Sequence, residues 1–139
     1  MKLKHNILVV EDNLGDARLI KEILNEFKIS NNLYHANDGA IALQMLYREG
    51  EYSDIPRPDL ILLDMDLPKK DGKDVLKDIK LNNKLSNIPI IILTGSAQDV
   101  ENNTYVKFVD AVLLKSTELE EFEKIANCIQ QVLNKIKKN

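Results

Sequence analysis

The sequence predicts an α/β fold, in which a doubly wound, five-stranded parallel sheet carries helices on both faces. Two observations predict it. Short apolar runs rich in β-branched residues recur along the chain with the length of strands, and segments with apolar residues at helical spacing separate them. Strands that alternate with helices form right-handed βαβ units, which build a parallel sheet. The runs are Asn6–Val10, Asn32–His35, Leu60–Leu63, Pro89–Leu93 and Ala111–Leu114.

The composition of these runs distinguishes central strands from an edge strand. ILVV, LILL and IIIL are almost continuously apolar, as expected of strands that are buried on both faces of a parallel sheet. The second run, NLYH, is more polar and suits an edge of the sheet.

Helices are expected between and after the strands. Asp38, before Gly39-Ala40-Ile41, is a candidate N-cap, and Ser96-x-x-Asp99 and Thr117-x-x-Glu120 are candidate capping boxes. The least regular helix is expected between Gln98 and Phe108, because two asparagines and a threonine interrupt its apolar pattern. The clearest helical stripes span Ala17–Phe27, Leu43–Tyr47, Val75–Ile79 and Leu119–Ile136.

Length and composition limit the classes of protein. A chain of 139 residues suits one compact domain, and a formal net charge of -3 gives no global attraction to nucleic acid or to an anionic membrane. No run approaches a membrane span, and the N-terminal apolar stretch is too brief for a signal peptide, so we expect a cytoplasmic protein. The single cysteine, Cys128, lies in an apolar helical stripe and is expected in the core.

Polar residues follow four of the five apolar runs at the point where each run ends. Glu11 and Asp12 follow the first, Asp64 the third, Thr94 the fourth and Lys115 the fifth. The carboxyl ends of parallel strands share one edge of a sheet, where ligands bind at the switch in strand order. Any one of these residues could simply begin a loop or cap a helix. Their occurrence after four strands makes coincidence a poor explanation.

The chemistry of this set points to a metal and a phosphoryl group. Three carboxylates brought together repel one another, which raises carboxyl pKa values unless a cation is present. Mg²⁺ prefers such oxygen ligands, and it would neutralise a phosphoryl group under attack by a carboxylate. Thr94 and Lys115 could bind the remaining phosphoryl oxygens.

Four sequence stretches resemble the receiver domains of two-component signalling. They are LVVEDN at 8–13, LILLDMDLPKKDG at 60–72, IIILTGS at 90–96 and LLKS at 113–116. The resemblance covers essentially the whole chain and implies one receiver domain over residues 1–139, with a flavodoxin-like (βα)5 fold and strand order 2-1-3-4-5. Within the family, the PRP-x-LILLD and LPKKDG stretches and a Lys-Ser in place of Lys-Pro are most similar to small single-domain regulators that partner bacterial phytochromes.

The resemblance also implies the roles of the site residues. Asp64 would be the phosphoacceptor and a metal ligand, Asp12 a direct Mg²⁺ ligand, and Glu11 a ligand acting largely through metal-bound water. Asp66 would bind the metal through its backbone carbonyl. Thr94 would be the switch hydroxyl and Lys115 the ammonium that contacts the phosphoryl group, while Pro68 and Gly72 would shape the loop after the third strand.

The implied function is that of a stand-alone response regulator. It would accept a phosphoryl group from a sensor histidine kinase in an Mg²⁺-dependent reaction and signal through a phosphorylation-dependent surface, to a downstream protein or to a second copy of the chain. It would be a phosphoacceptor signalling protein rather than an enzyme, although it would assist its own phosphorylation and dephosphorylation. No nucleic-acid or membrane partner is expected.

Two positions depart from the family pattern. Val112 stands where many receivers have Tyr, Phe or His as a rotamer switch, which puts an aromatic swing in doubt. Ser116 stands where a proline preceded by a cis bond is usual, and a cis bond before serine would cost roughly 3–4 kcal/mol, so a trans bond and stored strain are both open.

Two other classes compete with this interpretation. Asp64-Met65-Asp66 matches the nucleophile motif of haloacid-dehalogenase phosphohydrolases, although that motif normally lies on the first strand and its second acid pair comes late. A pseudo-receiver used only for binding would not need the five polar residues together. Dinucleotide binding is disfavoured because one glycine and two acids follow the first run, where a pyrophosphate would need a glycine-rich turn.

Overall fold

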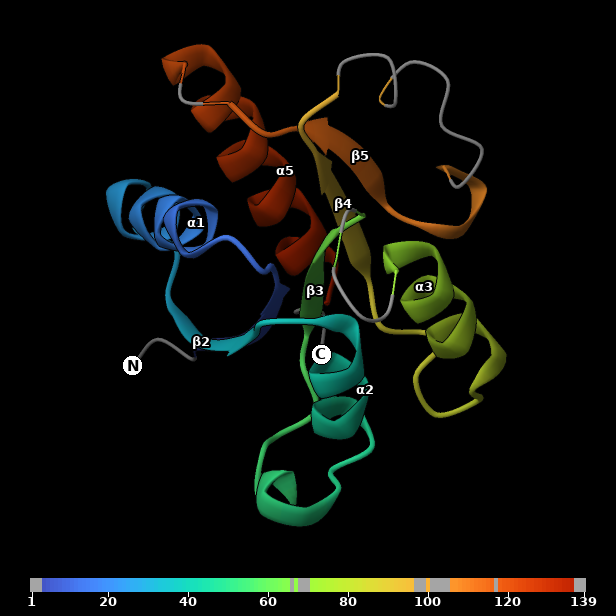
Figure 1. The fold of residues 1–139 in the computed structure, drawn as a ribbon. Coiled ribbons are helices and arrows are strands. Elements are labelled where there is room, and N and C mark those ends of the chain that lie inside the picture. The colour runs from blue at the N-terminus through green and yellow to red at the C-terminus, as the bar shows by residue number, and fades with distance from the viewer. Residues whose placement is uncertain are drawn as a thin grey trace.

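The computed structural model describes residues 4–65, 67, 71–96, 100, 106–116 and 118–136. Its five strands form one parallel sheet in the order β2-β1-β3-β4-β5, which confirms the predicted fold class and strand order (Figure 1). The strands are β1 (His5–Val10), β2 (Asn31–Ala36), β3 (Leu60–Asp64), β4 (Ile90–Thr94) and β5 (Ala111–Leu114). The helices are α1 (Leu14–Glu26), α2 (Gly39–Leu46), α3 (Gly72–Leu81) and α5 (Leu119–Ile136), with 3-10 turns η1 (Gly50–Tyr52) and η2 (Val106–Phe108).

The helices cover both faces of the sheet. α1 and α5 pack on one face, and α2 and α3 pack on the other (Figure 1). Side chains alternate along each strand, so that Leu8 and Val10 of β1 join the α2–α3 core while Ile7 and Val9 join the α1–α5 core. This two-sided burial explains why the central strands are continuously apolar.

The element boundaries differ from the predicted ones by a residue or so. His5, expected before the first strand, is its first residue, and β2 continues past His35 to Ala36. β4 begins after Pro89 and includes Thr94, since the ladder hydrogen bonds extend to the polar residue. Cys128 is only half-buried, packed against the edge of the α1–α5 core rather than enclosed in it.

Helix starts agree with the sequence where the structure describes them. The Asp38 carboxylate accepts a hydrogen bond from the Ile41 backbone N–H at 2.8 Å, as predicted for an N-cap. Asp99 and Thr117, one residue of each predicted capping box, lie outside the described residues. Of the helix expected between Gln98 and Phe108, the described portion holds Val100 and the turn η2.

In the described ranges, no helix is both long enough and apolar enough to cross a membrane.

Candidate metal centre

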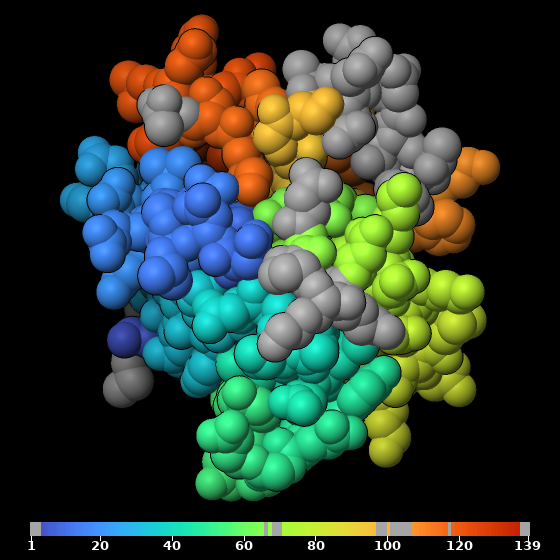
Figure 2. All heavy atoms as spheres, viewed as in Figure 1, coloured from blue at the N-terminus to red at the C-terminus, as the bar shows by residue number. Residues whose placement is uncertain are grey.

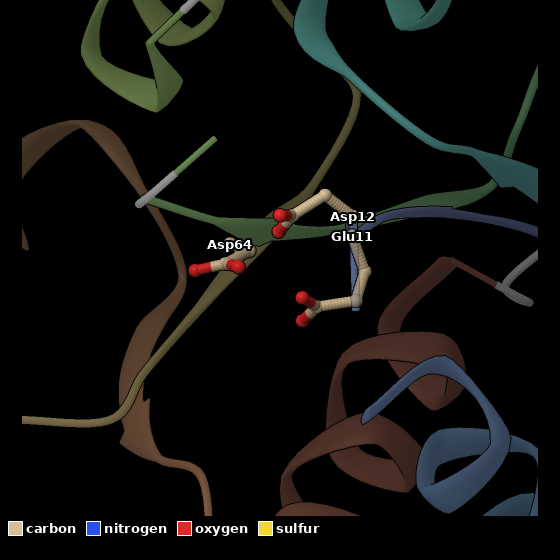
Figure 3. Close-up of side chains that lie close together, drawn as sticks. All are labelled: Glu11, Asp12 and Asp64. Atoms are coloured by element: carbon tan, nitrogen blue, oxygen red, sulfur yellow. The ribbon is translucent and has the colours of Figure 1, made fainter. Parts of the chain in front are cut away.

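Three carboxylates meet at the carboxyl edge of the sheet. Glu11 and Asp12 directly follow β1, and Asp64 is the last residue of β3, the neighbouring strand. The register pairs Val10 with Leu63, so the next residues of the two strands, Glu11 and Asp64, lie side by side. One oxygen from each of the three carboxylates lies within 4.8 Å of the others, and Figure 3 shows the side chains around a common space.

These carboxylates differ in their environment. Glu11 and Asp64 are each only 3% exposed, whereas Asp12 is exposed at the mouth of the site. Burial, together with the hydrogen bond and the negative charge of Asp64, raises the pKa of Glu11 to about 7. The three carboxylates therefore repel one another, and three hard oxygen ligands suit a divalent ion such as Mg²⁺.

Lys115 supplies a positive charge to the same cluster. Its Nζ lies 3.2 Å from Glu11 Oε1, 3.3 Å from Asp64 Oδ2 and 2.9 Å from Asp16 Oδ2. Burial alone would lower the pKa of Lys115, but the hydrogen bond to Asp16 and the charges of Asp64 and Glu11 outweigh it and raise the pKa. The ammonium therefore stays charged in the metal-free protein.

Thr94 ends β4 beside this cluster. Asp64 of β3 pairs with Leu93, so Thr94 is one residue further toward the edge. Thr94 is 1% exposed, its Oγ1 accepts a hydrogen bond from the Ser96 N–H at 3.2 Å, and its backbone oxygen accepts one from the Lys115 N–H at 2.7 Å. The structure thus brings together Glu11, Asp12, Asp64, Thr94 and Lys115 at one edge, as the sequence predicts.

The space-filling view shows the same convergence from outside. Segments coloured blue, green, yellow and orange, which are distant in sequence, meet on one face of the molecule (Figure 2).

The start of α3 lies directly against the end of β3. A Cβ on Gly72 would lie 2.6 Å from Met65 Cα and 2.7 Å from the Asp64 backbone oxygen, so only glycine permits this approach. The Gly72 N–H donates to the Met65 carbonyl at 3.3 Å. Gly72 thus shapes the site by close packing, while Asp66 and Pro68 lie outside the described residues.

Two residues near the site have roles that sequence reasoning missed. Asp16, in the first turn of α1, binds Lys115, although its position after Asn13 resembles that of an ordinary helix-start acid. His35, the last residue of the second predicted strand, has Nε2 at 2.7 Å from the Glu11 backbone oxygen. A carbonyl oxygen can only accept, so Nε2 carries the proton. A strand-end histidine and a first-turn acid are too common to signal these contacts.

The two departures from the family pattern have plain structural settings. Val112 is partly buried and packs against the core beneath α2 and α3. None of the described peptide bonds is cis, so the Lys115–Ser116 bond is trans, and the Ser116 Oγ accepts a hydrogen bond from the Glu118 N–H at 3.0 Å.

The comparisons with known proteins agree with this geometry. Residues 7–127 match the response regulator receiver domain. Response regulator Rcp1 of a Synechocystis species is 42% identical over 125 residues, which cover 89% of this chain and 85% of the relative.

Solved structures give the same result. A phosphorylated cyanobacterial phytochrome response regulator, RcpA, is 38% identical with a TM-score of 0.80, and the match covers 93% of each chain. The Mn²⁺-bound form of Rcp1 has a TM-score of 0.77 at 42% identity, covering 91% of this chain and 92% of that one. The bacteriophytochrome response regulator AtBRR has a TM-score of 0.79 at 34% identity, covering 94% of each chain.

Proposed function

This chain belongs to the response regulator receiver family, and on that premise we propose that it accepts a phosphoryl group from a histidine kinase on Asp64, in a reaction that requires Mg²⁺. The observation that carries the proposal is the placement of the Asp64 carboxylate, which is buried beside Glu11 and Asp12 and lies 3.3 Å from the Lys115 ammonium. A carboxylate can act as nucleophile toward phosphorus when the surrounding negative charge is neutralised.

In the proposed reaction, an oxygen of Asp64 attacks the phosphorus of a phosphohistidine. The new P–O bond forms as the P–N bond breaks, and the imidazole leaves with the electron pair of that bond. The Lys115 ammonium binds one phosphoryl oxygen by charge, and the Thr94 hydroxyl donates a hydrogen bond to another. The product is an aspartyl phosphate on Asp64.

Glu11, Asp12 and Asp64 are the residues of this chain that would hold the metal, with the backbone carbonyl of Asp66 as a further ligand implied by the family resemblance. When bound, Mg²⁺ supplies charge neutralisation for the phosphoryl oxygens. The three-carboxylate donor set fits this ion. A relative of known structure, Rcp1, binds Mn²⁺, an ion with similar ligand preferences.

The names of the similar proteins suggest the kind of partner. Several are phytochrome response regulators, so we expect the kinase to be a sensor histidine kinase of the phytochrome type. We propose that residues 1–139 act as one receiver domain in the cytoplasm, without nucleic-acid or membrane partners. The output would be a phosphorylation-dependent surface between Thr94 and α5, which binds a downstream protein or a second copy of the chain.

The test uses a small phosphodonor with Mg²⁺, followed by intact-mass measurement. We expect one added phosphoryl group that is lost in base, as an acyl phosphate should be, and no addition when Mg²⁺ is chelated. Labelling on another residue, or labelling that does not depend on the metal, would contradict the proposal.

A further inference from the structure

Lys115 contacts one carboxylate more than the proposed reaction uses. Its Nζ lies closest to Asp16 Oδ2, at 2.9 Å, and slightly further from the oxygens of Glu11 and Asp64, at 3.2 and 3.3 Å. A lysine ammonium has three N–H donors. Each donor therefore has one carboxylate acceptor, and two of these acceptors are the proposed metal ligands Glu11 and Asp64.

The helix start explains why the Asp16 carboxylate binds Lys115. Asp16 is the third residue of α1, where in a capping box an acidic side chain accepts a hydrogen bond from the N-cap backbone N–H. Here the N-cap is Asn13, and its backbone N–H instead donates to Glu11 Oε2 at 3.2 Å. The Asn13 side chain accepts from the Asp16 N–H at 2.9 Å and fixes the backbone of that residue. Asp16 thus keeps its place in the first turn while its carboxylate accepts from Lys115.

We propose that Asp16 is a positioning residue, which holds one N–H of Lys115 and so limits how tightly the ammonium binds Glu11 and Asp64. This inference rests on the proposed function. Lys115 and Mg²⁺ compete for the same two carboxylates, Glu11 and Asp64, because each of them neutralises the charge of the cluster. When Asp16 also binds the ammonium, Mg²⁺ displaces Lys115 from Glu11 and Asp64 more readily than it would if those two carboxylates were its only partners.

The contact between Asp16 and Lys115 also acts after the metal has bound. Glu11 and Asp64 would then share their charge with the ion, but Asp16 lies outside the proposed ligand set and keeps its hold on Lys115. The ammonium therefore stays within reach of a phosphoryl group on Asp64.

The experiment is a double-mutant cycle between Asp16 and Lys115, read out as Mg²⁺ affinity by titration in the absence of any phosphodonor. The variants are Asp16→Asn, Lys115→Met and both together. Glu22→Gln is the matched control, because it makes the same change of charge at an exposed position of α1 that is not one of the three carboxylates bonded to Lys115. Asp16→Glu keeps the charge and tests whether a longer carboxylate restores the contact.

We expect Asp16→Asn to weaken Mg²⁺ binding by roughly threefold or more relative to Glu22→Gln. In the Lys115→Met background, the fold-loss of Mg²⁺ affinity caused by Asp16→Asn should be less than about half as large. Asp16→Glu should restore most of the affinity. An equal loss in both backgrounds would mean that Asp16 acts only through its long-range charge, and no loss would mean that it does not act at all. Either result would overturn the proposal.

A second measurement is independent of the metal. In chelator, the unfolding constants of the wild type, Asp16→Asn, Lys115→Met and the double variant should show a coupling between Asp16 and Lys115 of roughly threefold or more. The absence of coupling would contradict the contact. Phosphodonor labelling of the wild-type chain separates the two proposals. Normal labelling without coupling refutes the role of Asp16 alone, and coupling without labelling refutes the phosphoacceptor function alone.

Discussion

In β3 and β4 the body of the strand and its carboxyl end are both buried but differ in chemistry. In β3, Leu60, Ile61, Leu62 and Leu63 are at most 1% exposed, and the next residue, Asp64, is 3% exposed. In β4, Thr94 follows four buried apolar residues in the same way. Apolar burial stabilises the fold, whereas a buried carboxylate costs free energy unless it is paired. Within one strand, the apolar residues therefore stabilise the fold and the polar residue that follows them supplies the chemistry. Substitutions at adjacent positions can test this separation.

The largest effect should come from Asp64→Asn. An amide is not a nucleophile toward phosphorus, so labelling by a phosphodonor should fall to background while the circular dichroism spectrum remains that of the folded protein. Substantial labelling of this variant would show that the phosphoryl group goes elsewhere.

Leu63→Ala should have the reverse phenotype. Leu63 is fully buried in the core beneath α2 and α3, and truncation of a buried leucine costs about 2–5 kcal/mol of unfolding free energy. Urea unfolding measures this loss, and labelling in the absence of urea should persist because Asp64 is unchanged. A similar loss of labelling in both variants would mean that stability and chemistry are not separable along this strand.

Gly72→Ala tests the contact between α3 and the end of β3. The added methyl group would lie 2.6 Å from backbone at Met65, so the chain must shift, at a cost of about 1–3 kcal/mol typical of overpacking. Unfolding should report the cost, and Mg²⁺ titration should show weaker binding because Asp64 adjoins the shifted segment. An unchanged stability would mean that the backbone relaxes without penalty.

The pH dependence of metal binding should reveal the protonation of Glu11. Its pKa of about 7 in the metal-free fold means that below this pH a bound ion must displace a proton, so Mg²⁺ affinity should fall by up to about tenfold per pH unit. Isothermal titration in buffers of different ionisation enthalpy would count the released proton. Glu11→Gln should abolish the release.

The same raised pKa affects stability in chelator. Between the ordinary value of 4.5 and about 7, the folded state holds a proton that the unfolded state has lost. The contribution of Glu11 to the free energy of unfolding therefore decreases as pH rises through that window and is constant above it. Comparing wild type with Glu11→Gln across the window isolates this contribution.

The smallest effect is expected from Asp66→Asn, which also tests the phosphohydrolase alternative. The backbone carbonyl survives the substitution, so a receiver should keep most of its labelling. A phosphohydrolase would need the Asp66 carboxyl as an acid and would hydrolyse a generic phosphoester in the wild type. Turnover of such a substrate, abolished by Asp66→Asn, would favour that class.

The sequence predicts the sheet, its order and most of the site, because these depend on patterns that repeat. Continuous apolar runs mark the buried strands, and a polar residue at the end of four of the five runs marks the shared edge. Asp12, Asp64 and Thr94 could therefore be placed together from their positions alone. Glu11 could be placed as well, but its raised pKa depends on burial beside Asp64, which no sequence pattern specifies.

Contacts between side chains of separate elements could not be predicted. The pairing of Asp16 with Lys115 depends on how α1 approaches the end of β5, and 99 residues separate the two in the chain. Gly72 could be predicted as part of the loop, but its close approach to Met65 needs the position of α3. The observed strand ends differ from the predicted ones because ladder hydrogen bonds, rather than apolar side chains, decide where a strand stops.

The position of β2 has a consequence for the motions of the site. Among the described strands, β2 is an edge strand that pairs with β1 alone. Its last residue nevertheless accepts the Glu11 N–H at 3.0 Å, and His35 binds the Glu11 carbonyl at 2.7 Å. Edge strands open more readily than central ones, and such local unfolding would remove both of these contacts to the backbone of Glu11, a proposed metal ligand. A ligand that fixes Glu11 should therefore slow amide hydrogen exchange in β2, a strand that contributes no side chain to the carboxylate cluster.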